Sequence, residues 1–494
     1  MPDEAVLSSL SSSLAGGVAG PGRLAELIPL ALKGFAAGVT ERGGAAPSGG
    51  PAAVAAEVAA VNPHEGLPAR GMGAERALSE FSRLLAAGSV DPADPWCAAH
   101  LHCPPLAVAV AADVVAGALN PSMDSWDQAP VASEVERAFT AGIARLCYPG
   151  EVSPDAVVTT GGTESNLLGL LLARENSPGR VVQPVCGRNA HHSVARAAWL
   201  LGMPAPVVVA CEADKMVPSA LAEVLAGLEN VVVVATAGTT NTGEIDPLPE
   251  IAALCRQLGA RLHVDAAYGG MALCSPKLGV LLAGLEAADS VALDMHKFGW
   301  QPISAGLFAC RDGHGLDALT VRAEYLNADD DTEAGLPDLL GRSIRTSRRP
   351  DAFRMAVTLH ALGTDGVGEL IERCCETASG VAQAIVDHPG LRLWGPPALS
   401  TVLFRPSLAD GLPDTVADEV IARIRRVLLE AGTAVIGRAA MPTGAGGTDQ
   451  LWLKLTLLHP YATVEDYRSL LDLVVATESE ASPNHQTEES PVAS

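Results

Sequence analysis

The sequence has few aromatic residues and no excess of positive charge. Phe, Trp and Tyr make up 4% of its 494 residues, and 57 acidic against 33 basic residues give a net charge of −24. A chain so acidic repels phosphate backbones and anionic membrane surfaces, so we expect no nucleic-acid partner. Acidic residues in such numbers are ordinarily found on a solvated surface.

The sequence also lacks metal-binding cysteine spacing and long apolar runs. Its ten cysteines include no C-x-x-C pair, so we expect reduced, buried thiols and no bound metal. The start, MPDEAVLSSLSSSLAGG, is acidic where a secretory signal is basic. The apolar run Leu106–Leu119 is interrupted by Asp113 and is too short to cross a bilayer. These absences predict a cytoplasmic protein.

Short apolar runs alternate with helical stretches in the middle of the chain. Parallel strands buried on both faces produce such runs, and the helical stretches complete βα units. After about residue 365 the pattern favours a smaller α+β unit. The predicted strands of the large unit are Ala156–Thr160, Val181–Val185, Ala205–Val209, Val231–Thr236, Leu262–Asp265 and Val291–Leu293. In the smaller unit we predict helices over Gly368–Val386 and Thr415–Ala431 and strands over Ser400–Phe404 and Leu451–Leu457.

We divide the chain into an N-terminal segment and linker (1–75), a large domain (76–365), a small C-terminal domain (366–476) and a tail (477–494). In the first segment we expect a helix over Leu24–Phe35 and a loose Gly/Ala/Pro-rich connector over 37–56. The polar, Ser/Glu-rich tail is typical of a disordered segment.

Two motifs at predicted strand ends carry groups that a Schiff-base site needs, although each also has an ordinary structural reading, since a lone lysine after an apolar run is usually a solvated strand end. Asp294-Met-His-Lys297 is followed by Phe-Gly-Trp, an apolar setting that lowers a lysine's pKa, as a Schiff-base amine requires. In His263–Gly270 (HVDAAYGG), Asp265 ends a strand and either caps a helix or pairs with a protonated pyridine nitrogen. Ala267 is small enough for a planar ring to lie against the strand.

Three further motifs have ordinary structural readings when taken singly. Thr160-Gly-Gly-Thr-Glu-Ser-Asn166 is a strand-to-helix turn whose glycines, hydroxyls and helix N-terminus suit a phosphate. In Asn189-Ala-His191-His192-Ser193, only one of the adjacent histidines can face a given site. The Thr-rich turn 237–243 follows a strand where such sheets bind ligands, so we expect Thr239 to contact the cofactor.

Taken in chain order, these motifs resemble those of the group II pyridoxal-phosphate amino-acid decarboxylases over about residues 60–475. The resemblance implies that Lys297 carries pyridoxal 5'-phosphate and that Asp265 pairs with its ring nitrogen. It implies that His191 stacks on the ring, while Gly162, Thr163 and His296 lie near the phosphate.

The resemblance also implies a fold, an assembly and a reaction. The fold would be the type I, aspartate aminotransferase-like α/β fold, a mostly parallel seven-stranded sheet with a small α+β domain. The chain would form a homodimer with shared active sites, the N-terminal segment wrapping the partner. It would remove the α-carboxylate of an L-amino acid to give an amine and CO2. An aminotransferase or an aldehyde-forming decarboxylase is the alternative, and a cofactor-free regulatory protein is disfavoured by Lys297 and Asp265.

The group that protonates Cα is open at this stage. Related aromatic amino-acid decarboxylases carry a loop tyrosine some way before a double arginine, a position that here corresponds to Leu339. The nearest tyrosine is Tyr325, and His191 is the competing candidate.

Within the family, the likeness is strongest to the L-2,4-diaminobutyrate decarboxylase branch, which would give 1,3-diaminopropane. A second ammonium needs acidic neighbours, and Asp124 and Asp127 supply them unless they are turn and cap residues. Valine, aspartate, glutamate and tyrosine stay open as substrates because the sequence departs from the branch at Pro350, His459 and Asp94-Pro-Trp-Cys97. The stretches that carry the likeness are HLHCPPL (100–106), NPSMDSWDQAP (120–130), Glu324-Tyr-Leu-Asn, Ser343-x-x-Thr-x-Arg-Arg349, LSTVLFRP (399–406) and Leu453-Lys-Leu-Thr-x-Leu-x-Pro460.

Overall fold

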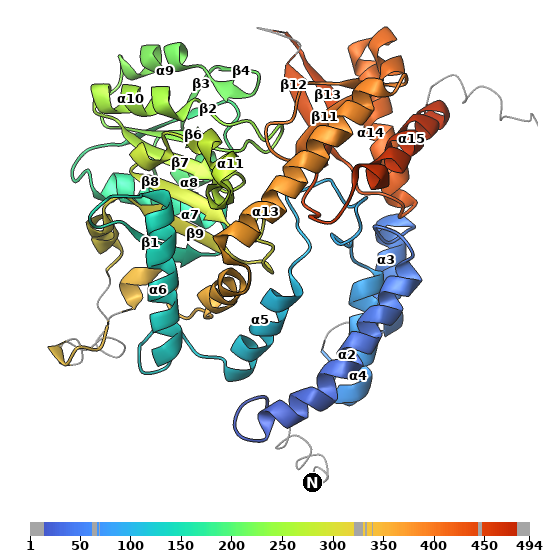
Figure 1. The fold of residues 1–494 in the computed structure, drawn as a ribbon, viewed down its shortest axis with the longest axis horizontal. Coiled ribbons are helices and arrows are strands. Elements are labelled where there is room, and N and C mark those ends of the chain that lie inside the picture. The colour runs from blue at the N-terminus through green and yellow to red at the C-terminus, as the bar shows by residue number, and fades with distance from the viewer. Residues whose placement is uncertain are drawn as a thin grey trace, which may run out of the picture.

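The computed structural model describes residues 14–61, 67–68, 70–320, 330, 333–337, 339–442 and 447–481. Figure 1 shows a large α/β body, a smaller unit built from the C-terminal part of the chain, and N-terminal helices that extend away from the large body. No helix within these described ranges is both long and apolar enough to cross a membrane.

The large body is built on a sheet of seven strands in the order β1-β9-β8-β7-β6-β2-β3. β9 is antiparallel to its neighbours β1 and β8, and the other pairs are parallel. The mostly parallel seven-stranded sheet is therefore confirmed. Its strands are β1 (Asp155–Thr159), β2 (Gln183–Gly187), β3 (Val207–Val209), β6 (Val231–Thr236), β7 (Arg261–Ala266), β8 (Ser290–Asp294) and β9 (Gly306–Cys310).

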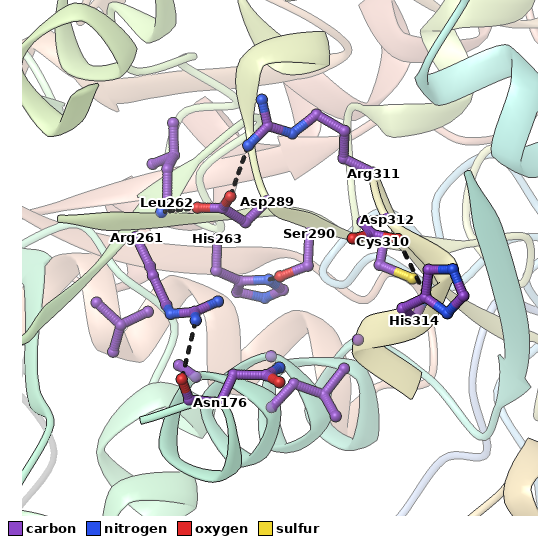
Figure 2. Close-up of a pocket in the computed structure, with 15 residues that line it drawn as sticks. Asn176, Arg261, Leu262, His263, Asp289, Ser290, Cys310, Arg311, Asp312 and His314 are labelled. Carbon is purple, nitrogen blue, oxygen red and sulfur yellow. Dashed lines mark hydrogen bonds and ion pairs between the residues drawn. The ribbon is translucent and has the colours of Figure 1, made fainter. Parts of the chain in front are cut away.

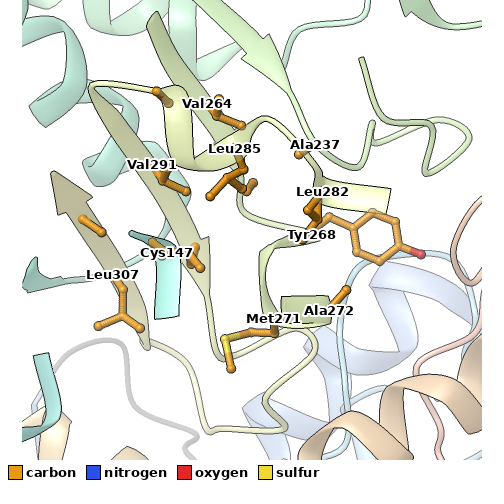
Figure 3. Close-up of a cluster of buried hydrophobic side chains, with 14 of the residues drawn as sticks. Cys147, Ala237, Val264, Tyr268, Met271, Ala272, Leu282, Leu285, Val291 and Leu307 are labelled. Carbon is orange, nitrogen blue, oxygen red and sulfur yellow. The ribbon is translucent and has the colours of Figure 1, made fainter. Parts of the chain in front are cut away.

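Helices cover both faces of this sheet, which explains why its strands are apolar throughout. Every residue of β6 is buried, and its valines alternate between two separate hydrophobic clusters, Val232 and Val234 on one side and Val231 and Val233 on the other. Two-sided burial of this kind gives a continuous apolar run. Figure 3 shows part of one of these clusters, with Val264, Val291 and Leu307. One face carries α7 (Gly162–Glu175) and α8 (Ser193–Leu200), and the other carries α6 (Pro130–Cys147), α9 (Pro218–Leu225), α10 (Leu248–Leu258) and the first part of α13 (Asp351–Asp387).

The smaller unit is an antiparallel sheet in the order β10-β11-β13-β12. The second part of α13 packs on it, so this one helix joins the cores of both units. α13 departs from helical geometry at Gly363 (φ 70°), close to the domain boundary that we placed at 365/366. The elements of this unit are β10 (Leu391–Leu393), β11 (Thr401–Pro406), α14 (Asp414–Glu430), β12 (Gly437–Pro442), β13 (Asp449–Thr456) and α15 (Val464–Ala481).

The N-terminal region differs from our expectation. The helix predicted over Leu24–Phe35 is longer, α2 (Gly20–Arg42), and α3 (Gly50–Val61) follows. The connector predicted over 37–56 is therefore confined to residues 43–49, and the rest of that prediction is wrong. Glycine there permits close packing: a Cβ at Gly38 would lie 2.3 Å from the carbonyl oxygen of Arg83 in α4 (Ala74–Ala87). Gly38 therefore permits a contact between helices, whereas Gly43 and Gly49, both with positive φ, lie in the short connection between α2 and α3.

Two other segments also prove helical. The apolar run before Asn120 forms α5 (Ala107–Leu119). Helix α15 continues to Ala481, so residues 477–481 of the predicted tail are helical, and residues 482–494 lie outside the described ranges. The remaining short elements are β4 (Cys211–Glu212), β5 (Lys215–Met216) and α11 (Pro276–Gly279).

The packing of α7 on β7 gives a stability prediction. A Cβ at Gly169 would lie 2.6 Å from His263 Nδ1 and 2.8 Å from two further ring atoms, and His263 is buried. We expect Gly169→Ala to lower the free energy of unfolding by about 1–3 kcal/mol through overpacking, measured by urea denaturation. Gly117→Ala in α5, where a Cβ meets nothing within 4 Å, is the control and should be neutral or slightly stabilising. Equal stability of Gly169→Ala and wild type would contradict this packing.

Candidate active site

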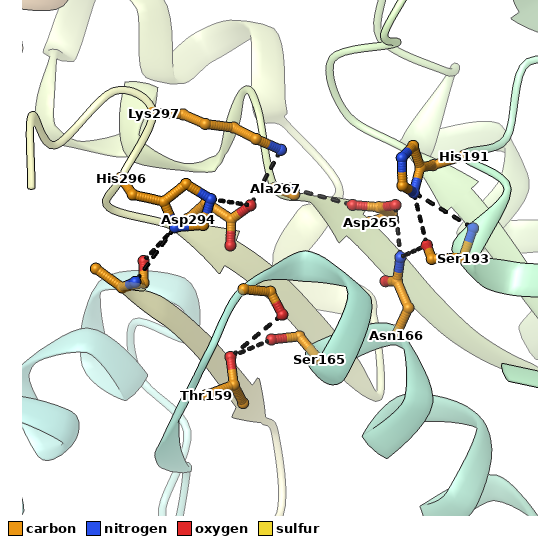
Figure 4. A network of polar contacts seen from close by, with 12 residues as sticks. Thr159, Ser165, Asn166, His191, Ser193, Asp265, Ala267, Asp294, His296 and Lys297 are labelled. Atoms are coloured by element: carbon orange, nitrogen blue, oxygen red, sulfur yellow. Dashed lines mark hydrogen bonds and ion pairs between the residues drawn. The ribbon is translucent and has the colours of Figure 1, made fainter. Parts of the chain in front are cut away.

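A cavity of about 320 Å³ lies where the parallel strands β1, β6, β7 and β8 end. The carboxyl ends of parallel strands share one edge of a sheet, which is where such folds bind ligands. Most of the residues that we predicted from separate motifs meet here (Figure 4). They are Gly162, Thr163, His191, Asp265, Ala267, His296 and Lys297.

Asp265, at the end of β7, is held by hydrogen bonds to both carboxylate oxygens. Its Oδ2 accepts from the Asn166 amide at 2.7 Å, and its Oδ1 accepts from the backbone N–H of Ala267 at 3.1 Å. The side chain is buried yet lines the cavity. A buried carboxylate oriented in this way can pair with a cationic ring nitrogen.

The turn between β1 and α7 brings a helix N-terminus to the same cavity. A Cβ at Gly162 would lie 2.7 Å from the Cβ of Ala267, so only glycine allows this approach. Glu164 closes the turn, since its Oε2 accepts from both the backbone N–H and the hydroxyl of Thr160 at 2.7 Å. The N–H groups at the start of α7, with the hydroxyl of Thr163, form a suitable site for a phosphate.

Lys297 is the nucleophilic amine of the cavity. Its Nζ lies 3.0 Å from Asp294 Oδ2, and His296 Nε2 lies 3.5 Å from the same oxygen. Burial lowers the pKa of His296, and the charge of Asp294 opposes that shift. Asp294 Oδ1 is buried and has no hydrogen-bond partner in the described part of the chain. An acceptor left unpaired in a buried site indicates a missing ligand or water.

His191 lines the cavity, whereas the neighbouring His192 is exposed, as expected for adjacent histidines. Burial is the main cause that lowers the pKa of His191. Its Nδ1 lies 2.8 Å from the hydroxyl of Ser193, so the ring is oriented from one side.

One predicted residue, Thr239, is not among the residues that line the cavity. The hydroxyl of Thr239 donates to Asp214 at 2.5 Å, away from the cavity, and its neighbours Gly238 and Thr240 form the wall instead. The side chains of consecutive residues in an extended turn point different ways, which the sequence motif did not resolve. Tyr325 lies outside the described residues.

Sequence reasoning missed two residues of the site, Asn166 and Asp294. Asn166 follows Thr163 by one helical turn, so it faces the same side of α7 and bonds Asp265. That helical spacing was a usable signal. Asp294 is the first residue of the D-x-H-K motif and the last residue of β8, and Asp265 is the second-last residue of β7.

The residues present fit pyridoxal phosphate. The cavity contains an amine that can bond an aldehyde, a buried carboxylate for a pyridinium nitrogen and a helix N-terminus for a phosphate. The unpaired Asp294 Oδ1 and the close contact at Gly162 show that this pocket is shaped for a ligand rather than filled by side chains.

Comparison with known proteins agrees with this chemistry. The family model "Pyridoxal-dependent decarboxylase conserved domain" matches residues 64–406. The chain is 38% identical to L-2,4-diaminobutyrate decarboxylase of Rhizobium meliloti (strain 1021) over 85% of each chain. It is 35% identical to the enzyme of that name from Acinetobacter baumannii, over 82% of this chain and 84% of the relative.

A solved structure extends the likeness to the fold. The glutamate decarboxylase domain of diaminobutyrate-pyruvate transaminase and L-2,4-diaminobutyrate decarboxylase from Vibrio parahaemolyticus superposes with a TM-score of 0.83 and 29% identity, covering 97% of this chain and 100% of that one. The type I fold is thereby confirmed. With the lysine, the aspartate and the phosphate turn in one cavity, this chain belongs to the pyridoxal-dependent decarboxylase family and is a pyridoxal-phosphate-dependent amino-acid decarboxylase.

Proposed function

We propose that this decarboxylase converts L-2,4-diaminobutyrate to 1,3-diaminopropane and CO2. The observation that carries the proposal is the match to two enzymes of that name, each over more than four fifths of the chain. An acidic amino acid decarboxylase of Mus musculus matches 60% of the chain at 33% identity, which keeps glutamate and aspartate as alternatives. Valine and tyrosine are the aliphatic and aromatic alternatives.

The acidic residues of the 120–130 stretch do not add support from within one subunit. Asp124 is buried and accepts hydrogen bonds from Gln128 at 2.8 Å and Ser347 at 3.3 Å. Asp127 is exposed, and neither residue lines the cavity. These contacts favour the turn interpretation of Asp124.

The residues of the cavity divide the catalytic work. Lys297 would hold the cofactor through its ε-amine, Asp265 its ring nitrogen, Gly162 and Thr163 its phosphate, and His191 one ring face. Bound pyridoxal phosphate supplies an electron sink for the pair left behind when the carboxylate departs as CO2. Asp265, fixed by Asn166 and the Ala267 N–H, keeps its charge where the ring nitrogen would lie. His191 and Tyr325 are the two candidates to return a proton to Cα.

We also propose a cytoplasmic homodimer with shared active sites. Helix α2 exposes Leu32 (58%) and Phe35 (52%), although it lies apart from the large body (Figure 1). An apolar groove of about 870 Å³ runs between α6 and α13, with Phe139 and Phe353 among its lining. Exposed apolar surface on this scale favours association with a second copy.

The role of Lys297 is tested by Lys297→Ala. Among the described residues that line the cavity, Lys297 is the one lysine. Turnover should therefore fall by several orders of magnitude, and the absorbance of the bound cofactor should shift. The control is Lys277→Ala, which removes an exposed lysine paired with Glu376 at 2.8 Å and should leave both properties unchanged. Normal turnover by Lys297→Ala would overturn the assignment.

The proton donor is tested with Tyr325→Phe and His191→Gln. Whichever residue returns the proton should, when replaced, lower the rate of amine formation by about 10²-fold or more, measured by product analysis that also detects aldehyde. Full decarboxylation by Tyr325→Phe together with its loss in His191→Gln favours the histidine, and the reverse favours the tyrosine.

The substrate is tested by competition. The purified holoenzyme is given equimolar L-2,4-diaminobutyrate, ornithine, valine, glutamate and tyrosine, and the amines formed are identified. We expect diaminobutyrate to be consumed first and 1,3-diaminopropane to accumulate. If valine or tyrosine is consumed while diaminobutyrate is untouched, the substrate proposal is wrong, although the decarboxylase family would stand.

The dimer is tested by replacing Leu32 and Phe35 together with Glu. Charges at a buried interface are costly, so we expect the mass in solution to fall from twice the 50.6 kDa of one chain toward that of one chain, with loss of turnover. Val152→Glu, at an exposed position (97%) outside α2, is the matched control. A wild-type enzyme that is fully active as a monomer would contradict the proposal.

A further inference from the structure

A chain of hydrogen bonds leads from the active site through the contact between α7 and β7 (Figure 4). Its centre is Asn166, whose Nδ2 lies 2.7 Å from Asp265 Oδ2 and 2.8 Å from Ser193 Oγ. The amide oxygen of Asn166 lies 2.9 Å from His263 Nε2. All four side chains are buried, so water does not compete for these bonds.

The Asp265 carboxylate determines the direction of the hydrogen bonds from Asn166 to His263 and from His263 to Ser290. Asp265 can only accept, so the NH2 group of Asn166 must face it and the amide oxygen must face His263. His263 Nε2 therefore carries a proton. Burial lowers the pKa of His263 to about 4, so the ring is neutral and Nδ1 accepts from the hydroxyl of Ser290 at 2.8 Å. His263 and Ser290 also line a second cavity, of about 340 Å³, at the opposite end of the sheet (Figure 2).

The hydrogen bonds from Asn166 through Ser193 determine which nitrogen of His191 carries the proton. The second amide hydrogen of Asn166 is donated to Ser193 Oγ, so the hydroxyl hydrogen of Ser193 is free to donate to His191 Nδ1 at 2.8 Å. The backbone N–H of Ser193 points to the same nitrogen at 3.3 Å. Nδ1 is thus an acceptor twice over, and a neutral His191 must carry its proton on Nε2.

We propose that Asn166 and His263 are positioning residues that hold His191 as the Nε2–H tautomer, so that it presents a hydrogen-bond donor to the cavity. Within the described part of the chain, no protein group bonds Nε2, and His191 lines the cavity. A donor there is complementary to an acceptor such as the carboxylate of an amino acid. The opposite tautomer would present a lone pair and repel it. The inference rests on the proposed place of His191 beside the cofactor.

The ring nitrogens of His191 can be observed directly. In holoenzyme labelled with ¹⁵N-histidine, the two His191 signals are identified by their loss in His191→Gln. At neutral pH we expect Nδ1 to resonate as an unprotonated nitrogen and Nε2 as a protonated one. A protonated Nδ1 in the wild-type enzyme would overturn the proposal, whatever the enzyme's substrate or rate.

Variants then test whether Asn166 and His263 set that state. In Asn166→Ala, Ser193 loses the donor that directs its hydroxyl, so the His191 signals should shift toward an average of both tautomers. We expect kcat/KM to fall about tenfold or more, in line with loss of a hydrogen bond to a charged group, with a rise in KM because the substrate carboxylate loses its donor. Ser290→Ala, which removes only the outermost link beyond His263, should shift the signals in the same direction by less.

The matched control is Asn189→Ala. Asn189 is a part-buried asparagine on the connection between β2 and α8, which also carries His191. Its amide, however, donates to Asp246 at 2.8 Å. Its replacement should leave the His191 signals unchanged, even where stability falls. If the signals of Asn166→Ala match those of wild type, the backbone N–H of Ser193 suffices and the positioning role is refuted. Amine formation measured in parallel keeps this outcome separate from failure of the decarboxylase assignment.

Discussion

The hydrogen bond between the Asn166 amide and the Asp265 carboxylate is the contact on which the active site depends. It joins the first turns of α7 to the end of β7 at 2.7 Å, with both residues buried. A buried carboxylate is costly unless its oxygens are satisfied. Asn166 meets that requirement and, through its remaining amide groups, also orients Ser193 and His263. One amide therefore links Asp265 and, through Ser193, His191 of the cavity to the core of the sheet.

This contact is possible because α7 lies unusually close to the sheet. Glycines at 162 and 169 allow the helix to approach Ala267 and His263, where any Cβ would overlap. The same approach brings the N-terminus of α7 to the cavity, so close packing and the proposed phosphate site have one cause. A larger residue at either position would move the helix, and with it the amide that holds Asp265.

The long helix α13 joins the large body to the smaller unit. Its first part belongs to the core of the large body and its second part to the core of the smaller unit. Contacts between the units also reach the site directly, since Lys454 of β13 donates to the carbonyl of Thr240, which lines the cavity, at 2.9 Å. Residues of both units therefore position the cavity wall. Burial lowers the pKa of Lys454.

The sequence by itself determined the parts of this enzyme that are local. Lys297, Asp265 and the Gly162 turn could be predicted, as could the strand β6, because each lies in a short motif whose chemistry or apolar run is legible without the fold. The Gly-rich stretch 37–56 was predicted as a connector throughout, although only residues 43–49 connect two helices, since nothing local reveals that Gly38 allows α2 to pack on α4. Thr239 was misplaced because a motif does not say which side chain of a turn faces inward. Only the tertiary structure decided that Asn166 meets Asp265 and His263, residues about a hundred positions away, because that contact forms only when α7 crosses the end of β7.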